Sequence, residues 1–460
     1  MEDLFDRIQA ITGISKYSNA EVITPKAIVA DMVDLLPVEV FAPDSRFLDP
    51  AVKSGRFLAE LYRRLMASPL MVQAFPDEQD RQKHILDNQL YGLATSPVAA
   101  TVTRKALYDD PTIAGNIVYV DRYLVKMADK TTDFKKLVQG EFGENMKFDV
   151  VIGNPPYQEP TDGGSTAKSG KPLYTEFVIK VNQLKPKYMS FIIPTRWYTD
   201  TTREASQAVR DILLTSHTST IVDIPNATDV FPSVQIAGGV MYFLKGPTAQ
   251  SRCKVRQYND IHTFETELNT ERFIRYRVAN SIDLKIKSID SRRMTEIAFK
   301  MNPFGLKRAD TGDIVPIKSD DLEVISSLGA GYIRNGSITK NSHIIEKYKV
   351  IVGYGITSQD KVITVPKILK PHTVCTLTYC VFGASDSLMV AENIASYLKT
   401  RFVRFLIKAT LVNATITVDN LVLVPLQDFS HPWTDQMLYD KYGLTQDEID
   451  YIEATIKPME

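Results

Sequence analysis

The sequence predicts an α/β protein, with a mixed, mostly parallel sheet in its first half and a mixed α+β region in its second half. Strand-like and helix-like segments alternate from residue 46 to residue 246, at the spacing of strand–helix–strand units. Two strand ends in this half, DPAVKSG and NPPY, carry polar residues where a parallel sheet binds ligands. After about residue 250 the alternation stops. We therefore expect a first domain over 1–250, a second over 251–430 and a helical tail over 431–460.

The individual elements follow from the period of the apolar residues. In the first half we expect strands over 46–49, 89–93, 116–120, 148–152, 188–194, 219–224 and 237–246. The helices expected between them cover 54–66, 96–108, 173–184 and 203–214. In the second half we expect β-like runs over 349–355, 360–369 and 374–383, one helix over 391–408, and two short helices separated at Gly443.

The composition is that of a globular protein, with 44% hydrophobic and 24% charged residues. Its three cysteines, Cys253, Cys375 and Cys380, have no metal-like spacing, so we expect neither a metal site nor a disulfide framework. No apolar run is long enough to span a membrane and the first residues lack a signal pattern, which predicts a cytoplasmic protein with no membrane partner.

Charge is distributed unevenly along the chain. Residues 252–408 contain 25 Lys and Arg against 16 Asp and Glu, whereas the remainder contains 29 against 39. A basic region beside an acidic one indicates that the second region faces a polyanion. The arginines Arg272, Arg275, Arg277, Arg292 and Arg293 are candidates for phosphate contacts. The alternative is ordinary charge scatter on a solvated surface.

Two motifs carry the chemistry. Asp49-Pro50, followed by Ser54-Gly55, ends one strand and opens a helix, where backbone N–H groups approach a ligand closely. Asn154-Pro155-Pro156-Tyr157 ends another strand about a hundred residues later. Together they resemble motif I and motif IV of the amino-group DNA methyltransferases. The resemblance implies a Rossmann-like fold that binds S-adenosylmethionine and methylates an exocyclic nitrogen.

The residue types of motif IV suit that reaction. The amino nitrogen of adenine is a poor nucleophile because its lone pair is delocalised into the ring. The Asn154 side-chain oxygen and the Pro155 carbonyl would accept its two hydrogens and direct the lone pair at the methyl donor, and the prolines keep these acceptors in place. Tyr157 would stack on a base rotated out of the duplex. The alternative for Pro155-Pro156 is a turn that merely closes a strand.

Further segments fix the subclass. Thr24-Pro25 resembles the end of motif X, and the resemblance places it near the cofactor. Asp121 falls at motif III, where it would accept from the amino group of the cofactor adenine. Phe231 falls at motif VIII, as a second wall of the base pocket. The motif order is that of the γ-class adenine-N6 methyltransferases. The chain also resembles the methylase part of combined restriction–modification (type IIG-like) proteins.

Two departures concern the cofactor. Lys53 stands where motif I has a second glycine, and no acidic residue follows the strand at 89–93 to bind the ribose hydroxyls. Thr95 or Ser96 would give a weaker, neutral hydrogen bond there. A non-catalytic DNA-binding or specificity subunit with a degenerate cofactor pocket is therefore one alternative.

The principal expectation is a sequence-specific DNA adenine-N6 methyltransferase that uses S-adenosylmethionine, acts on duplex DNA in a restriction–modification or related defence system, and has a possible restriction-endonuclease partner. A third candidate is an RNA or protein-glutamine methyltransferase, since those families also use NPPY.

Overall fold

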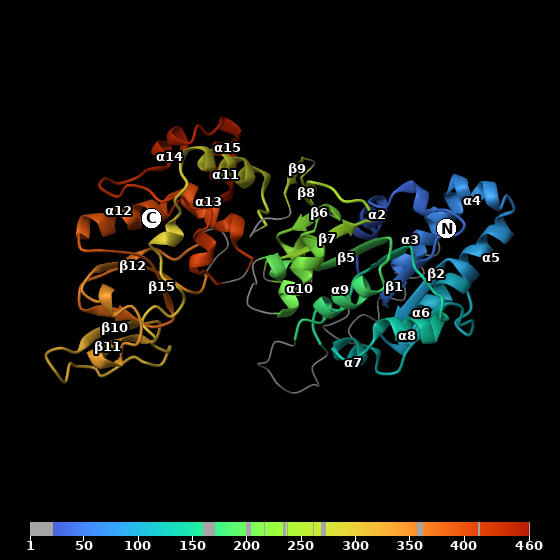
Figure 1. Ribbon diagram of the computed structural model, residues 1–460, viewed down its shortest axis with the longest axis horizontal. Helices are drawn as coiled ribbons and strands as arrows, with labels where there is room; N and C mark the ends of the chain where they lie inside the picture. Colours follow the sequence, from blue (N-terminus) through green and yellow to red (C-terminus); the bar gives the residue numbers. More distant parts are fainter. Residues whose placement is uncertain are drawn as a thin grey trace. The chain divides into compact units, whose positions relative to one another are not determined.

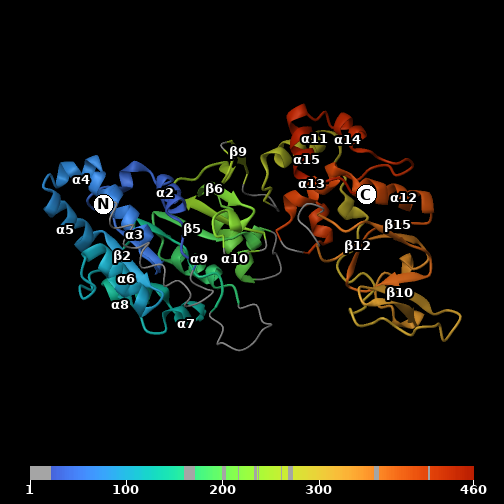
Figure 2. The same cartoon turned by 180° about the vertical axis from the view of Figure 1, so that it is seen from behind.

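The computed structural model describes residues 22–159, 171–198, 204–215, 217–232, 236, 238–260, 262–267, 273–356, 362–412 and 415–459. The chain forms two compact units, Met1–Glu271 and Arg272–Glu460 (Figures 1 and 2). No helix among these described residues is long and apolar enough to cross a membrane.

The first unit is built on a nine-stranded sheet in the order β3-β2-β1-β4-β5-β7-β6-β8-β9. Strands β1 to β5 run parallel, and β7 is inserted antiparallel between β5 and β6, so the predicted mixed, mostly parallel sheet is confirmed. The strands are β1 (Phe47–Val52), β2 (Leu90–Ala94), β3 (Ile117–Tyr119), β4 (Val150–Gly153), β5 (Tyr188–Pro194), β6 (Thr218–Ile224), β7 (Val240–Lys245), β8 (Cys253–Gln257) and β9 (Thr263–Thr266).

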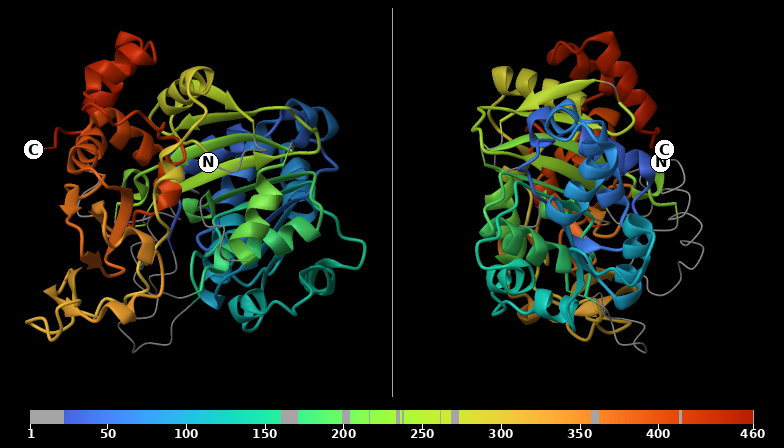
Figure 3. Two further views of the ribbon diagram at one scale, coloured as in Figure 1. Left: turned by 60° about the vertical axis from the view of Figure 1, so that its left-hand side comes forward. Right: turned by 90° about the vertical axis from the view of Figure 1, so that its right-hand side faces the viewer.

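Helices cover both faces of this sheet (Figure 3). The residues Val150 and Ile152 of β4 join one apolar cluster with helices α2, α3, α5 and α6, whereas Val151 between them points away from it. On the other face α9 contacts β5 and is flanked by α7, α8 and α10. The helices are α2 (Lys26–Asp34), α3 (Arg56–Ala67), α4 (Pro69–Ala74), α5 (Glu78–Asn88), α6 (Pro97–Tyr108), α7 (Tyr123–Ala128), α8 (Phe134–Phe142), α9 (Leu173–Gln183) and α10 (Glu204–Leu213).

The first unit extends to Glu271, beyond the end at residue 250 that we predicted from the sequence. Strand β8 pairs parallel with β6 and antiparallel with β9, so both strands belong to the large sheet. In β8 the buried Cys253 and Val255 alternate with the charged Lys254 and Arg256. A strand with this alternation has too few apolar residues to be recognised by its composition, which explains the displaced boundary.

The second unit contains two three-stranded sheets, β11-β10-β14 and β13-β12-β15. One apolar cluster joins residues of both sheets, such as Val324 of β10 and Ile351 of β12, and a second packs the other face of β12 and β15 against the helices. Their strands are β10 (Leu322–Ser326), β11 (Gly329–Ile333), β12 (Tyr348–Gly353), β13 (Lys367–Leu369), β14 (Thr373–Cys375) and β15 (Tyr379–Ser385). The helices are α11 (Arg277–Ile289), α12 (Leu388–Lys399), α13 (Arg401–Thr410), α14 (Asp435–Lys441) and α15 (Gln446–Thr455). The mixed α+β character predicted for this region is confirmed.

Two predicted elements of the second unit are each divided in two. The run 374–383 forms β14 and β15, and the helix 391–408 forms α12 and α13. Helix α13 begins after Thr400, whose hydroxyl oxygen accepts from Val403 N at 3.2 Å and so caps a new helix. The residues 431–460 form α14 and α15 as expected, but Leu438 and Ile452 lie in the core of the second unit, so these helices belong to that unit.

Candidate active site at the carboxyl ends of β1 and β4

The candidate site lies where the strand order reverses. Strand β1 pairs parallel with β2 on one side and with β4 on the other, and chain connections leave these strands in opposite directions. Ligands of doubly wound sheets bind at such a point, beyond the carboxyl ends of the strands. Asp49 in β1 and Asn154 directly after β4 are the polar residues at this edge that the motifs predicted.

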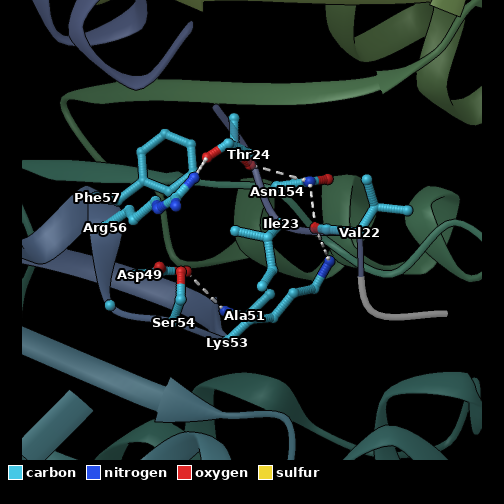
Figure 4. Close-up of a pocket in the computed structure, with 11 residues that line it drawn as sticks. Val22, Ile23, Thr24, Asp49, Ala51, Lys53, Ser54, Arg56, Phe57 and Asn154 are labelled. Atoms are coloured by element: carbon cyan, nitrogen blue, oxygen red, sulfur yellow. Dashed lines mark hydrogen bonds between the residues drawn. The ribbon is translucent and has the colours of Figure 1, made fainter. Parts of the chain in front are cut away.

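A small hollow opens at this point. Three chain segments line it: the stretch before α2, the β1–α3 turn and the end of β4 (Figure 4). Its lining residues are Val22, Ile23, Thr24, Asp49, Ala51, Lys53, Ser54, Gly55, Arg56, Phe57 and Asn154. Motifs X, I and IV therefore meet in one place, although they are far apart in the sequence.

Asn154 is buried, with 3% of its surface exposed. Its Nδ2 donates to Val22 O at 3.1 Å and to Thr24 Oγ1 at 3.0 Å. Its Oδ1 is buried and accepts from no group in the described part of the chain. Leaving a buried acceptor unpaired costs about 1–3 kcal/mol, and native structures rarely do so without a functional reason. The predicted acceptor for a substrate amino group is thus available.

The rest of the NPPY turn is held firmly. Pro155 and Pro156 are buried, and Tyr157 is partly buried against the apolar cluster of α2 and α3. The carbonyl oxygen of Tyr157 accepts from Leu173 N at 3.1 Å, which ties the turn to the start of α9. The Tyr157 hydroxyl is buried without a hydrogen-bond partner among the described residues, and burial raises its pKa.

Asp49 has an unusual environment for a carboxylate. Only 3% of its surface is exposed, and its Oδ1 accepts from Ala51 N at 2.9 Å. Burial raises its pKa to about 7, although the hydrogen bond from Ala51 and the nearby charge of Lys53 act in the opposite direction. Asp49 therefore changes charge near neutral pH, and a cation that binds beside it would favour its ionised form.

The β1–α3 turn is shaped by Gly55, which has φ of +75° and directly precedes α3. A β carbon at Gly55 would come within 2.8 Å of Thr103 Cγ2 in α6. The turn is tied to the stretch before α2 by two cations. Lys53 Nζ donates to Val22 O at 3.2 Å, and Arg56 Nη1 donates to Thr24 O at 2.9 Å. The lysine that replaces the usual glycine thus lines the hollow.

Other predicted cofactor residues lie outside the hollow but along the same edge. Because β3, β2, β1 and β4 are parallel neighbours, Asp121 after β3 and Thr95 after β2 form a row with Asp49 and Asn154. Asp121 is exposed. Thr95 is buried and its hydroxyl donates to Val52 O at 3.2 Å. Thr95 therefore uses its hydroxyl hydrogen within the protein.

Pro25 and Pro50 serve as framework. Pro25 precedes the first residue of α2, and the Pro50 carbonyl accepts from Tyr123 Oη at 2.7 Å. Tyr123 is fully buried at the start of α7, and sequence reasoning missed it. The signal available was slight, namely an aromatic residue two positions after Asp121. The bond fastens the segment after β3 to the Asp-Pro turn.

Phe231 lies in the apolar cluster against which Tyr157 packs, with 3% of its surface exposed. Its backbone N–H donates to Ala227 O at 2.8 Å. The structure therefore brings Phe231 and Tyr157 to one cluster. Because its side chain is buried, Phe231 could contact a base only if the residues that cover it moved away.

The arginines predicted to contact phosphates differ in their exposure. Arg272 lies outside the described residues. Arg275 is buried, with 2% exposed, so it is not a surface residue. Arg293 is largely covered, and its Nη1 donates to Asp290 O at 2.7 Å. Arg277 at the start of α11 is exposed, and so is Arg292, which pairs with Glu296 at 2.8 Å. The sequence alone does not show which of these arginines are buried and which are exposed.

The doubly wound sheet with an NPPY turn at the end of β4 is the arrangement that the resemblance to amino-group methyltransferases predicts. Residues 88–231 match the Eco57I restriction-modification methylase family. An "uncharacterized adenine-specific methylase" of Mycoplasma pneumoniae is 28% identical over 355 residues, which are 61% of this chain and 83% of that protein. Over residues 88–231 the chain is therefore similar to restriction-modification methylases, and over a longer stretch it is similar to an adenine-specific methylase.

Solved structures whose backbones align in part with this chain also come from restriction–modification systems. The modification subunit of a putative type I restriction enzyme from Vibrio vulnificus YJ016 has 14% identity and a TM-score of 0.39 over 58% of this chain and 52% of that chain. The type IIL enzyme MmeI, solved in complex with DNA, has 7% identity and a TM-score of 0.47 over 100% of this chain and 74% of that chain. The present chain thus spans about half the length of the Vibrio subunit.

Proposed function

We propose that this protein transfers a methyl group from S-adenosylmethionine to the N6 amino group of an adenine rotated out of duplex DNA. The observation that carries the proposal is the buried Asn154 Oδ1, which has no hydrogen-bond partner in the described part of the chain. It lies at the end of β4, beside the hollow that the Asp-Pro turn helps to form. An amino group is the substrate that such an acceptor fits.

The residues of the hollow fit the cofactor. Its methionine end carries an ammonium group and a carboxylate, and the hollow offers the buried Asp49 for the first and the cations Lys53 and Arg56 for the second. Ser54 and Gly55 place the N-terminus of the twelve-residue helix α3 beside it. Thr24 and Pro25 would lie at the methionine end, Pro50 behind it, and Thr95 and Asp121 farther along the same edge, toward the adenosine.

The protein's part in the reaction is to hold and polarise the amine. When bound, the cofactor supplies an electrophilic methyl group. Asn154 Oδ1 and the Pro155 carbonyl would accept the two amino hydrogens, so the nitrogen lone pair is directed at that group. Tyr157 would stack on the adenine ring, with Phe231 as the proposed second wall. The amine loses its extra proton to water after transfer, so no general base is required before attack.

We assign target recognition to the second unit, which includes most of the basic stretch 252–408 of the sequence. Its exposed Arg277 and Arg292 are the best placed of the five candidate arginines for phosphate contacts. Base-edge contacts from this unit would select the site in duplex DNA. A cytoplasmic enzyme of this kind would protect DNA from a restriction-endonuclease partner in a restriction–modification or related defence system.

The test uses purified protein, tritiated S-adenosylmethionine and DNA of mixed sequence. Label should enter the adenine N6 position with the wild type and not with Asn154→Ala. Label in RNA or protein alone would point to the other NPPY enzymes. Absence of label in DNA, at saturating cofactor and with DNA binding demonstrated, would contradict the proposal.

A second candidate function is a DNA-binding specificity subunit without catalysis. Thr95, which stands where an acidic residue would bind the ribose, has its hydroxyl hydrogen bound to Val52 O, and this favours a weaker cofactor site. Titration calorimetry separates the two candidates. Measurable binding of S-adenosylmethionine, with or without DNA, would support the methyltransferase. No measurable binding under either condition would support the non-catalytic specificity subunit.

A further inference from the structure

The segment 22–24, which precedes α2 and is called the strip below, makes hydrogen bonds both to Asn154 and to the β1–α3 turn. Val22 O accepts from Asn154 Nδ2 at 3.1 Å and from Lys53 Nζ at 3.2 Å. Thr24 Oγ1 accepts from Asn154 Nδ2 at 3.0 Å, and Thr24 O accepts from Arg56 Nη1 at 2.9 Å. Dashed lines mark these four bonds in the close-up of the hollow (Figure 4).

These contacts fix the orientation of the Asn154 amide. Its Nδ2 has two hydrogens, and the strip offers two acceptors for them. If the amide turned by half a revolution, Oδ1 would face the Val22 carbonyl, which has no hydrogen to give. The strip therefore selects the orientation in which Oδ1 is directed away from it. This is the orientation in which Oδ1 has no partner in the described ranges of the chain.

We propose that Thr24 is a positioning residue for the proposed methyl transfer, because its hydroxyl oxygen and the Val22 carbonyl hold the Asn154 amide with Oδ1 directed at the substrate amino group. This inference rests on the proposed function. It gives the Thr24 side chain a role toward the catalytic residue, whereas motif X implies a role toward the cofactor.

The strip itself has a firm support. Helix α2 begins two residues after Thr24, and its Asp31 is bound from two strands of the sheet. Arg256 of β8 donates to Asp31 Oδ2 at 2.5 Å, and the Tyr242 hydroxyl of β7 donates to the same oxygen. Asp31 and Arg256 expose 31% and 23% of their side chains, so the pair is shielded in part from solvent. A fixed α2 holds Thr24 at the distance that Asn154 requires.

The test compares Thr24→Val, which keeps the shape and removes the acceptor, with Thr24→Ser, which keeps the acceptor. For Thr24→Val we expect kcat to fall about 10- to 100-fold, while KM for S-adenosylmethionine and for DNA changes less than about threefold. Thr24→Ser should stay within about threefold of the wild type. Thr24→Ala serves in place of Thr24→Val if the valine variant folds poorly.

A second readout reports on Asn154 directly. In protein with ¹⁵N-labelled asparagine, the side-chain amide signal of Asn154, identified by its loss in Asn154→Asp, should shift in Thr24→Val and not in Thr24→Ser. An unchanged kcat in Thr24→Val, or a raised KM for S-adenosylmethionine at unchanged kcat, would overturn the inference. A wild type that transfers no methyl group overturns the proposed function instead, and the amide signal then still decides whether Thr24 orients Asn154.

Discussion

The Asp49 carboxylate and the backbone of Gly153 lie so close that a β carbon at Gly153 would come within 2.6 Å of Asp49 Oδ1. The two residues belong to the neighbouring parallel strands β1 and β4. Gly153 directly precedes Asn154, so the absence of a side chain at this one position lets the cofactor motif and the catalytic motif share an edge.

The first prediction is that Gly153→Ala disrupts the site. The added methyl group would collide with the buried carboxylate of Asp49, so either the strand β4 or the carboxylate must shift. We expect this shift to lower the free energy of unfolding by about 1–3 kcal/mol. Thermal unfolding and methyl transfer should both decline. Gly140→Ala is the matched control, because Gly140 in α8 has open space around its β-carbon position. That variant should be neutral or more stable by up to about 1 kcal/mol.

The second prediction concerns pH. The pKa of Asp49 is raised from 3.8 to about 7 in the folded protein, so the folded state binds the proton more tightly than the unfolded state. The resulting stability is fully present below about pH 3.8 and is lost as the pH rises through about 7. The melting temperature of the cofactor-free protein, relative to that of Asp49→Asn, should therefore fall between about pH 4 and pH 7 and level off above that range.

Cofactor binding should show the opposite trend at Asp49. If the ionised carboxylate meets the cation of S-adenosylmethionine, affinity rises as the pH increases through about 7, and binding releases protons. Calorimetry in buffers of different ionisation enthalpy measures that release. Equal pH dependence in the wild type and in Asp49→Asn would show that Asp49 does not contact the cofactor.

The third prediction separates the ring of Tyr157 from its hydroxyl. Because the hydroxyl is buried without a partner within the described segments, Tyr157→Phe should keep methyl transfer near the wild-type rate. Tyr157→Ala removes the stacking face, worth about 1–3 kcal/mol per base, and should lower kcat/KM for DNA about 5- to 150-fold. A large loss in the phenylalanine variant would instead mean that the hydroxyl contacts the substrate.

The fourth prediction distinguishes surface arginines from interior ones. Arg292→Ala, with or without Arg277→Ala, should weaken DNA binding and lower the salt dependence of the association constant by about one unit of slope per lost contact. Arg275→Ala should instead destabilise the second unit, since that side chain is buried. Binding titrations across a range of salt concentrations, together with thermal unfolding, measure both effects.

The sequence predicted those parts of the fold that depend on local pattern. The strands of the large sheet up to β7 and the turns after β1 and β4 were recognised from apolar period and from motif residues. β8 and β9 were not, because short strands with alternating charged residues resemble loops. The break at Thr400 was missed because both helices are apolar on one face, so their periods run together.

The same distinction holds for the candidate site. The placement of Asp49, Gly55 and Asn154 at one edge followed from the strand order. The bonds of Asn154 to Val22 and Thr24 span about 130 residues, and one of them uses a backbone carbonyl, which has no signature in sequence. The burial of Arg275 depends equally on tertiary packing.

The most direct measurement is long-read detection of modified adenine in DNA from cells that express this chain. With the wild type we predict N6-methyladenine at one short recognition sequence, and with Asn154→Ala, expressed at the same level, none above background. Modified adenine at equal levels with both proteins, or none with a wild type that binds both DNA and S-adenosylmethionine, would contradict methyl transfer by Asn154.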